Sequence, residues 1–213
     1  MTFNFNNKTI TPSTPDDIIL PFDFNTNSIN TVQKETEPSE YVSVINPYLT
    51  ADNDNGYKAL AKSISTWTNE PAYRAFDGNT GTRWLSDWNS YQWLPTWIQL
   101  TFPQITTIRA YKIQITKAES SQTERDRVPK KIRLYGSNSE DTSKTTLIPK
   151  GYILLDTQTD IPPATIDEGN IVFRTFELKE PASYKVYRLV IDERQGGAKS
   201  PYDAHLGTLD FLN

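Results

Sequence analysis

Hydrophobic and polar residues alternate along most of the chain after residue 40. Successive side chains of a β-strand point to opposite faces, so this period of two predicts strands with one buried and one solvated face. We expect strands at residues 41–45, 97–102, 111–115, 132–135, 172–176, 187–191 and 206–212. Residues 57–63 suit a helical turn or a strand, and we leave both open. Polar turns separate these segments, which is typical of an antiparallel all-β sandwich.

The first part of the chain has a different composition. It is rich in Asn, Thr, Ser and Pro, and its apolar residues form small islands such as Ile18-Ile19-Leu20. Such a segment cannot bury enough surface to offset the entropy lost on ordering. Its composition fits a flexible tail or an arm that lies against another surface. We expect residues 1–45 to be an extended N-terminal assembly or docking arm, and residues 46–213 to form the sandwich.

Composition excludes several functions. The formal charge is −4 and basic residues are scattered, so no basic stripe is available to bind nucleic acid. There is no Cys and only one His, which removes most nucleophile–base pairs and zinc sites built from several His. Paired carboxylates for glycoside hydrolysis stay open, but no pair stands out. We therefore expect no enzyme.

The N-terminus has neither the basic start nor the apolar core of a secretory signal, and no run of about 18 apolar residues occurs. We expect the protein to stay in the cell that makes it, or to leave by lysis or a specialised route.

Five short motifs follow one another in a characteristic order. They are AFDGNTGTRW at 75–84, WIQL at 97–100, YKIQI at 111–115, KIRLYGS at 131–137 and YRLVI at 187–191. This order resembles the discoidin (coagulation factor type C) domains and the family 32 carbohydrate-binding modules, over roughly residues 59–213. The resemblance implies a galactose-binding-like jelly-roll sandwich. We expect Gly78 and Gly81 to take positive φ in a tight turn, and Trp84 and Trp97 to plug the end of the thin core.

The resemblance also implies a structural Ca²⁺ ion in the Asp-Gly turn. Its ligands would be the Asp77 carboxylate, Thr82, and the carbonyl groups of Asn79 and Ala72. Relatives supply a second carboxylate near the C-terminus, where this chain has Thr208, with Asp210 two residues on. The alternative is that Asp77 only caps the turn through backbone N–H groups.

Ligands of the resembling modules bind to loops at one end of the sandwich. Here those loops are 66–73, 85–96, 117–128 and 192–205. The second loop carries three large aromatic residues, Trp88, Tyr91 and Trp93, beside Asp87 and Asn89. An aromatic ring can stack on a sugar face while Asp and Asn bond to its hydroxyl groups. The alternative for any one Trp is that it folds back into the core.

Two other loops add candidates. Trp67 lies in the first loop, and Arg125 and Arg127 lie in the third, where an Arg can bind the carboxylate of an acidic sugar. The alternative for that loop is a solvated set of ion pairs. The single His, His205, is expected to begin a strand rather than to contact ligand. Trp67, Trp88 and Trp93 could also imitate membrane-inserting spikes, but few Lys and several acidic residues disfavour a lipid surface.

Together these features favour a non-catalytic binding module. We expect a multi-copy phage or phage-like virion component (tail, baseplate or fibre) that recognises host-surface carbohydrate and docks to virion proteins through residues 1–45. The expected location is the virion, or otherwise the cytoplasm. The first alternative is a structural or decoration protein whose jelly-roll contacts only other virion proteins. The second is a cytoplasmic lectin or a fragment of a larger enzyme.

Overall fold

The chain consists of two compact units, Met1–Glu40 and Tyr41–Asn213. The computed structural model describes residues 41–65, 68–87, 94–115, 126–164, 172–197 and 204–213, and four short strands of the first unit. In that unit two antiparallel pairs form: β1 (Thr2–Asn4) with β2 (Thr9–Thr11), and β3 (Phe22–Asp23) with β4 (Ser28–Ile29). The division between the units lies before residue 45. Val42 and Val44 donate backbone bonds to Asn213 and Phe211, which ties this segment to the C-terminal strand.

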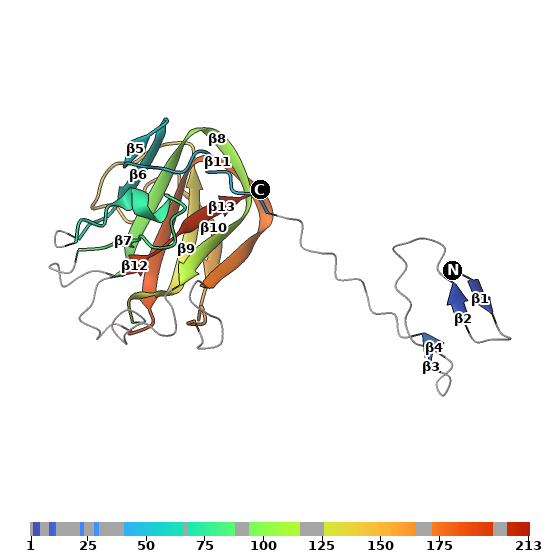
Figure 1. Ribbon diagram of the computed structural model, residues 1–213. Coiled ribbons are helices and arrows are strands. Elements are labelled where there is room, and N and C mark those ends of the chain that lie inside the picture. Colours follow the sequence, from blue (N-terminus) through green and yellow to red (C-terminus); the bar gives the residue numbers. More distant parts are fainter. Residues whose placement is uncertain are drawn as a thin grey trace. The chain divides into compact units, whose positions relative to one another are not determined.

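The second unit is an antiparallel all-β structure, as predicted (Figure 1). Its elements are β5 (Asn53–Asp54), β6 (Tyr57–Ala61), the 3₁₀ turn η1 (Ala72–Ala75), β7 (Trp84–Leu85), β8 (Thr96–Ile115), β9 (Pro129–Ser137), β10 (Ile153–Gln158), β11 (Val172–Arg194), β12 (His205–Leu206) and β13 (Leu209–Leu212). The ambiguous segment 57–63 is therefore mainly a strand. The predicted strand at 41–45 is reduced to one bridge between Ser43 and Leu212.

Two long strands, β8 and β11, belong to both layers of the sandwich. The first half of β8 pairs with β6 and with the second half of β11, while its second half pairs with β13 and with the first half of β11. The β8–β11 ladder shifts register between Glu177 and Ala182 and between Tyr184 and Val186, where both strands bend together. The bend folds the paired strands over, so that their two halves face each other across the core.

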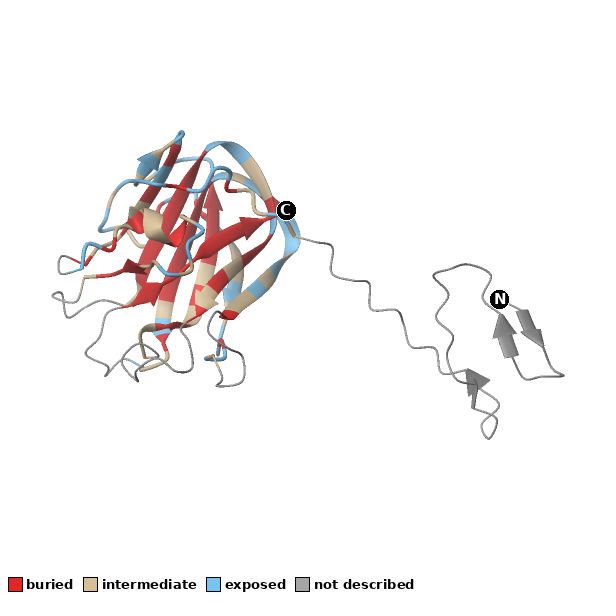
Figure 2. Ribbon diagram, viewed as in Figure 1, coloured by how far each residue is buried: buried red, intermediate tan, exposed pale blue. Residues whose placement is uncertain are grey.

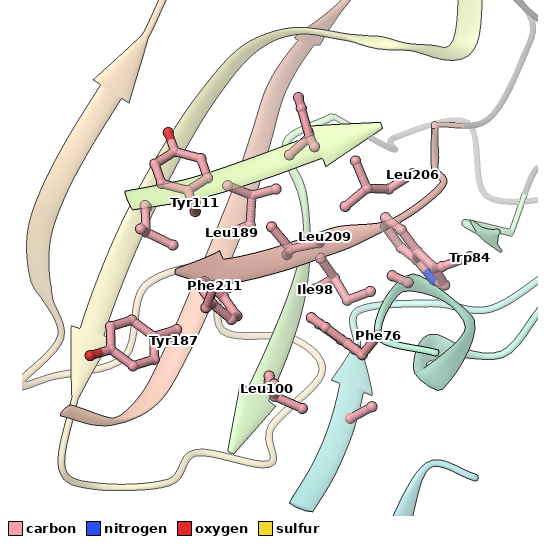
Figure 3. Packing of buried hydrophobic residues seen from close by; sticks show 14 of the residues in the cluster. Phe76, Trp84, Ile98, Leu100, Tyr111, Tyr187, Leu189, Leu206, Leu209 and Phe211 are labelled. Atoms are coloured by element: carbon pink, nitrogen blue, oxygen red, sulfur yellow. The ribbon is translucent and has the colours of Figure 1, made fainter. Parts of the chain in front are cut away.

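Aromatic rings join the two layers. The ring centroid of Phe211 on β13 lies 5.1 Å from that of Tyr187 and 5.9 Å from that of Phe102, both on the opposite layer. Leu209 points to the same side as Phe211, because alternate residues of a strand share a face (Figure 3). Trp84 is fully buried in this cluster, as predicted, and its indole N–H donates to the Ser63 carbonyl at 3.0 Å. The buried residues lie along the strands between the layers (Figure 2).

The prediction for Trp97 was wrong. On β8, Ile98 and Leu100 point into the sandwich, so Trp97 points to the outer face of the same sheet. There it packs in a second, smaller apolar cluster with Tyr135, Tyr152, Val186 and Val190. Tyr152 ends the segment 138–152, which covers this face.

Arg188 is the polar centre of that outer cluster. Its guanidinium group is fully buried and lies 3.8 Å from the centroid of the Trp97 ring. Its nitrogens donate to Gln99 Oε1 at 2.9 Å and to the carbonyl groups of Thr146, Leu147 and Asp141 at 2.9, 3.1 and 3.1 Å. Burial lowers the pKa of Arg188, so the carbonyl contacts offset a real desolvation cost. Arg188 thus bonds segment 138–152 to the sheet at three carbonyl groups, beside the packing of Tyr152 and Leu147.

We expect Arg188→Ala to lower the free energy of unfolding by about 3–5 kcal/mol, because it leaves buried carbonyl groups without donors. Amide hydrogen exchange should rise in residues 138–152 before it rises in β13. Arg109→Ala, at an exposed position of β8, is the control and should change stability little. Equal protection of residues 138–152 in Arg188→Ala and wild type would show that Arg188 does not hold the segment.

Candidate functional site at the loop end of the sandwich

The bends in β8 and β11 place four strand ends at one end of the sandwich. β8 begins at Thr96 and ends at Ile115, and β11 begins at Val172 and ends at Arg194. The register pairs Thr96 with Ile191 and Ile115 with Val172. Because each strand turns back midway, its two ends lie at the same end of the sandwich and its bend at the other (Figure 1). Predicted loops 85–96, 117–128 and 192–205 therefore leave from one end.

Short backbone bonds join the roots of the first, second and fourth loops. β7 pairs with β12, so that Leu85 lies opposite His205. The Ser65 N–H donates to the Leu85 carbonyl at 2.8 Å. Ser86 and Ala204 bond twice, through the Ser86 N–H to the Ala204 carbonyl and through the Ala204 N–H to Ser86 Oγ, both at 3.0 Å. The three loops consequently start from one hydrogen-bonded base.

The third loop is attached to the fourth. The Gln195 N–H donates to the Val128 carbonyl at 2.9 Å, and the Gly196 N–H donates to the Asp126 carbonyl at 3.0 Å. The roots of all four predicted loops are therefore connected by backbone bonds, directly or through β11 and β12.

A charged cluster lies within this base, with Glu70 and His205 buried and Arg83 partly exposed. Arg83 Nε donates to Glu70 Oε1 at 2.8 Å, and the Thr68 hydroxyl donates to the other Glu70 oxygen. Arg83 Nη1 lies 3.4 Å from His205 Nδ1. Because an Arg can only donate, His205 Nδ1 accepts, and the ring proton lies on Nε2. The cluster ties the first loop to β12 through side chains, in addition to the backbone bonds.

His205 is neutral in this setting. Burial, followed by the positive charges of Arg83 and Arg127, lowers the pKa of His205 from 6.5 to about 3. His205 begins β12, as predicted, and only 4% of its surface is exposed. It is a structural part of the loop base.

Two of the predicted ligand residues lie among the described residues. Asp87 follows β7 at intermediate exposure, and its backbone N–H donates to Ser63 Oγ at 3.2 Å. Arg127 lies close enough to His205 for its charge to act on that ring. The remaining candidates lie outside the described residues and stay predictions: Trp67, Trp88, Asn89, Tyr91, Trp93 and Arg125.

Three of the four predicted calcium residues, Asp77, Asn79 and Thr82, lie in one compact turn that directly precedes Arg83. Asp77 Oδ1 accepts from the Asn79 N–H at 2.8 Å, and Asp77 Oδ2 accepts from the Thr82 hydroxyl at 2.6 Å. The backbone-capping role proposed as the alternative for Asp77 is thus present. Ala72 begins η1 and is fully buried. Gly78 has a φ of +65°, as predicted, whereas Gly81 does not take a positive φ. Gly81 instead donates its N–H to Asn79 Oδ1, so the Asn79 side chain closes this half of the turn.

The described residues contain neither a metal-binding cluster nor a membrane-spanning helix. No three His, Asp or Glu side chains in those parts of the chain gather closely enough to hold a metal ion. No helix there has the length and apolar character needed to cross a membrane.

Sequence reasoning missed the Arg83–Glu70–His205 cluster. Arg83 and His205 are separated by 122 positions, and only the pairing of β7 with β12 brings them together. Arg83 directly precedes β7, so strand alternation gave no signal for the direction of its side chain.

Comparisons with known proteins support the fold. No family model matches the sequence, and no curated protein matches it. Many solved structures are similar in fold, among them the following three. The family 32 carbohydrate-binding module of Clostridium perfringens NanJ, in complex with galactose, has a TM-score of 0.52 and 19% identity, covering 74% of this chain and 94% of its own. Clostridium perfringens CpGH89CBM32-5, in complex with GalNAc-β-1,3-galactose, has a TM-score of 0.51 and 19% identity. The match covers 74% of this chain and 96% of that module.

The third is chitosan-binding module 2 of the chitosanase/glucanase from Paenibacillus sp. IK-5, in complex with chitotriose. It has a TM-score of 0.52 and 20% identity, covering 74% of this chain and 97% of its own. At these identities the similarity concerns the fold alone. The order of the sequence motifs and the bent, paired strands agree with that fold. The sandwich of this chain therefore has the discoidin-like galactose-binding fold of the family 32 carbohydrate-binding modules.

Proposed function

We propose that this protein is a non-catalytic carbohydrate-binding module and that its ligand binds at the loop end of the sandwich. The observation that carries the proposal is the connected base from which all four loops leave. Similar structures were solved with galactose, GalNAc-β-1,3-galactose and chitotriose, and they share this fold at low identity.

The loop base explains how a sugar would be held. Sugar binding needs aromatic faces and hydrogen-bonding groups kept in fixed positions, since each group ordered on binding costs free energy. The Arg83–Glu70–His205 cluster and the Ser86–Ala204 pair fix the start of loop 85–96 before any ligand arrives. Trp88, Tyr91 and Trp93 would then supply stacking surfaces, and Asp87 and Asn89 would bond to hydroxyl groups.

Two titratable groups of the loop base, His205 and Glu70, do not suit catalysis. The only His of the chain is His205, and a buried ring with a pKa of about 3 is too weak a base to accept a proton near neutral pH. Glu70 is already paired with Arg83 and Thr68. Binding without reaction is therefore the function that these residues support.

We further propose that the module is present in many copies on a phage or phage-like particle, where residues 1–45 contact other virion proteins. The compactness of Met1–Glu40 as a unit of its own supports a distinct attachment segment. Weak single sites gain strength when many copies act together. The competing proposal is a virion structural protein whose aromatic loop packs against a neighbouring subunit.

Replacement of a stacking aromatic should weaken glycan binding. We expect Trp88→Ala and Trp93→Ala each to weaken binding of GalNAc-β-1,3-galactose or chitotriose by about 30-fold, or about 2 kcal/mol. Isothermal titration after a glycan-array screen measures the change. Ile105→Ala is the control, because Ile105 is exposed at the bend of β8, at the far end of the sandwich. If no glycan binds the wild type at high valency, the structural alternative is favoured.

His205 should make the sandwich sensitive to acid. Because the pKa of His205 is about 3 in the folded state and 6.5 ordinarily, the unfolded chain binds a proton that the folded chain does not. Stability should therefore fall as the pH drops from about 6.5 toward 3. His205→Asn keeps an acceptor for Arg83 but cannot titrate, so its urea-unfolding free energy should fall less over this window. Parallel pH profiles for the two proteins would contradict the assignment.

The N-terminal unit should provide multivalency. We expect the full chain to form oligomers or to bind virion particles, and a chain starting at Tyr41 to stay monomeric with unchanged single-site affinity. Binding to a glycan-coated surface should then be 10²–10⁴-fold tighter for the full chain. Light scattering and surface binding measure both properties. A monomeric full chain that binds no particle would argue against an attachment role for residues 1–45.

A further inference from the structure

The turn formed by residues 77–82 is held mainly by its own hydrogen bonds. Both oxygens of the Asp77 carboxylate accept bonds, from the Asn79 N–H and the Thr82 hydroxyl. Asn79 Oδ1 accepts from the Gly81 N–H at 2.9 Å, and the Asn79 carbonyl accepts from the Thr82 N–H at 3.1 Å. Donors within the turn thus already engage the oxygens that the resemblance assigned to calcium in Asp77 and Asn79, and the Thr82 hydroxyl is itself a donor to Asp77.

Gln114 connects this turn to the C-terminal part of the chain. Gln114 Nε2 donates to the Thr80 carbonyl at 2.9 Å. Gln114 Oε1 accepts from the Thr208 hydroxyl at 3.2 Å and from the Thr208 N–H at 3.4 Å, while the Gln114 N–H donates to the Thr208 carbonyl at 2.7 Å. The orientation of the amide is fixed, because a flipped group would place its oxygen against a carbonyl and its nitrogen against an N–H.

The surroundings of Gln114 fit this role. A Cβ atom at Gly207 would lie 2.9 Å from Gln114 Cδ, so only glycine leaves room for the amide. On another side of the turn, a Cβ atom at Gly78 would lie 2.6 Å from the ring of Tyr48. The turn is therefore packed by Tyr48 and bonded by Gln114.

The nearest C-terminal carboxylate is engaged elsewhere. Asp210 is almost fully buried and accepts from the Ser43 hydroxyl at 2.6 Å and the Tyr48 hydroxyl at 3.3 Å. Lys112 Nζ lies 3.5 Å from the same carboxylate and balances its charge. Thr208, at the position where relatives carry a carboxylate, is bonded to Gln114.

We propose that the Gln114 amide takes the place of the calcium ion that the fold family implies, so that this sandwich is stable without calcium. Calcium prefers six to eight oxygen ligands, with carboxylates among them. Here an NH₂ group faces the Thr80 carbonyl, and among the described residues Asp77 supplies the one carboxylate that is hydrogen-bonded within the turn. The residues present suit a neutral amide bridge between the turn and Thr208, and they do not suit an ion.

Thermal unfolding of the full wild-type chain tests this directly. We expect the same melting temperature in excess EDTA and in millimolar CaCl₂. A saturable rise in the melting temperature with added Ca²⁺, or a drop on chelation that Ca²⁺ reverses, would overturn the proposal. This readout uses no glycan, so it stays separate from any failure to bind carbohydrate.

Two substitutions test the bridge itself. Gln114→Ala removes it and should lower the melting temperature by roughly 3–8 °C. Gln114→Glu places a carboxylate oxygen against the Thr80 carbonyl, so it should also lower the melting temperature at pH 7. That deficit relative to wild type should shrink toward pH 4, where a protonated Glu can donate.

Gln104→Ala is the matched control, because Gln104 is an exposed glutamine at the bend of the same strand. It should leave the melting temperature unchanged. If Gln114→Ala has the same melting temperature as the wild type, the amide does not bridge the turn and Thr208. The same holds if the melting temperature that Gln114→Glu loses relative to wild type does not depend on pH.

Discussion

The pairing of β8 with β11 is the constraint on which the rest of the sandwich depends. The two strands pair from Val172–Ile115 at one end of the ladder to Ile191–Thr96 at the other, with register shifts at the bends. Because they bend together, this one pair of strands supplies the centre of both layers, and β6, β9 and β13 add to its edges. The same bend brings the strand ends to one side. The loop end is thus a geometric consequence of the ladder.

Most of the fold was predictable from alternation and motif order, since inward-facing residues such as Ile98, Leu100 and Leu189 leave a period of two in the sequence. The continuity of the long strands was not predictable. Alternation stops at the bends, where side chains are exposed, while the backbone pairing resumes beyond them. β10 was missed because Ile153 and Leu154 are neighbours and both exposed, so the strand has no apolar–polar alternation to detect.

The candidate site was less predictable, because its contacts join residues far apart in sequence. The loops were located by resemblance, and the turn at Asp77 by its local Asp-Gly pattern. Arg83, Gln114 and Arg188 were not singled out, since each appears in the sequence as one polar residue of an alternating strand or turn. Their partners are 122, 94 and up to 89 positions away. Local patterns carry no information about such partners.

These three side chains share one physical role. Each extends from the regular framework, or from its edge, and bonds to a segment that has no strand partner: Arg188 to 138–152, Gln114 to 77–82, and Arg83 to the residues around Glu70. Irregular backbone must satisfy its carbonyl and N–H groups, and long side chains can do so where no neighbouring strand is available. The irregular segments are consequently anchored to the sandwich by residues that lie outside them. Substitutions within loop 85–96 can then change what the loop contacts while its base, held by Ser86, Ala204 and the Arg83 cluster, keeps its shape.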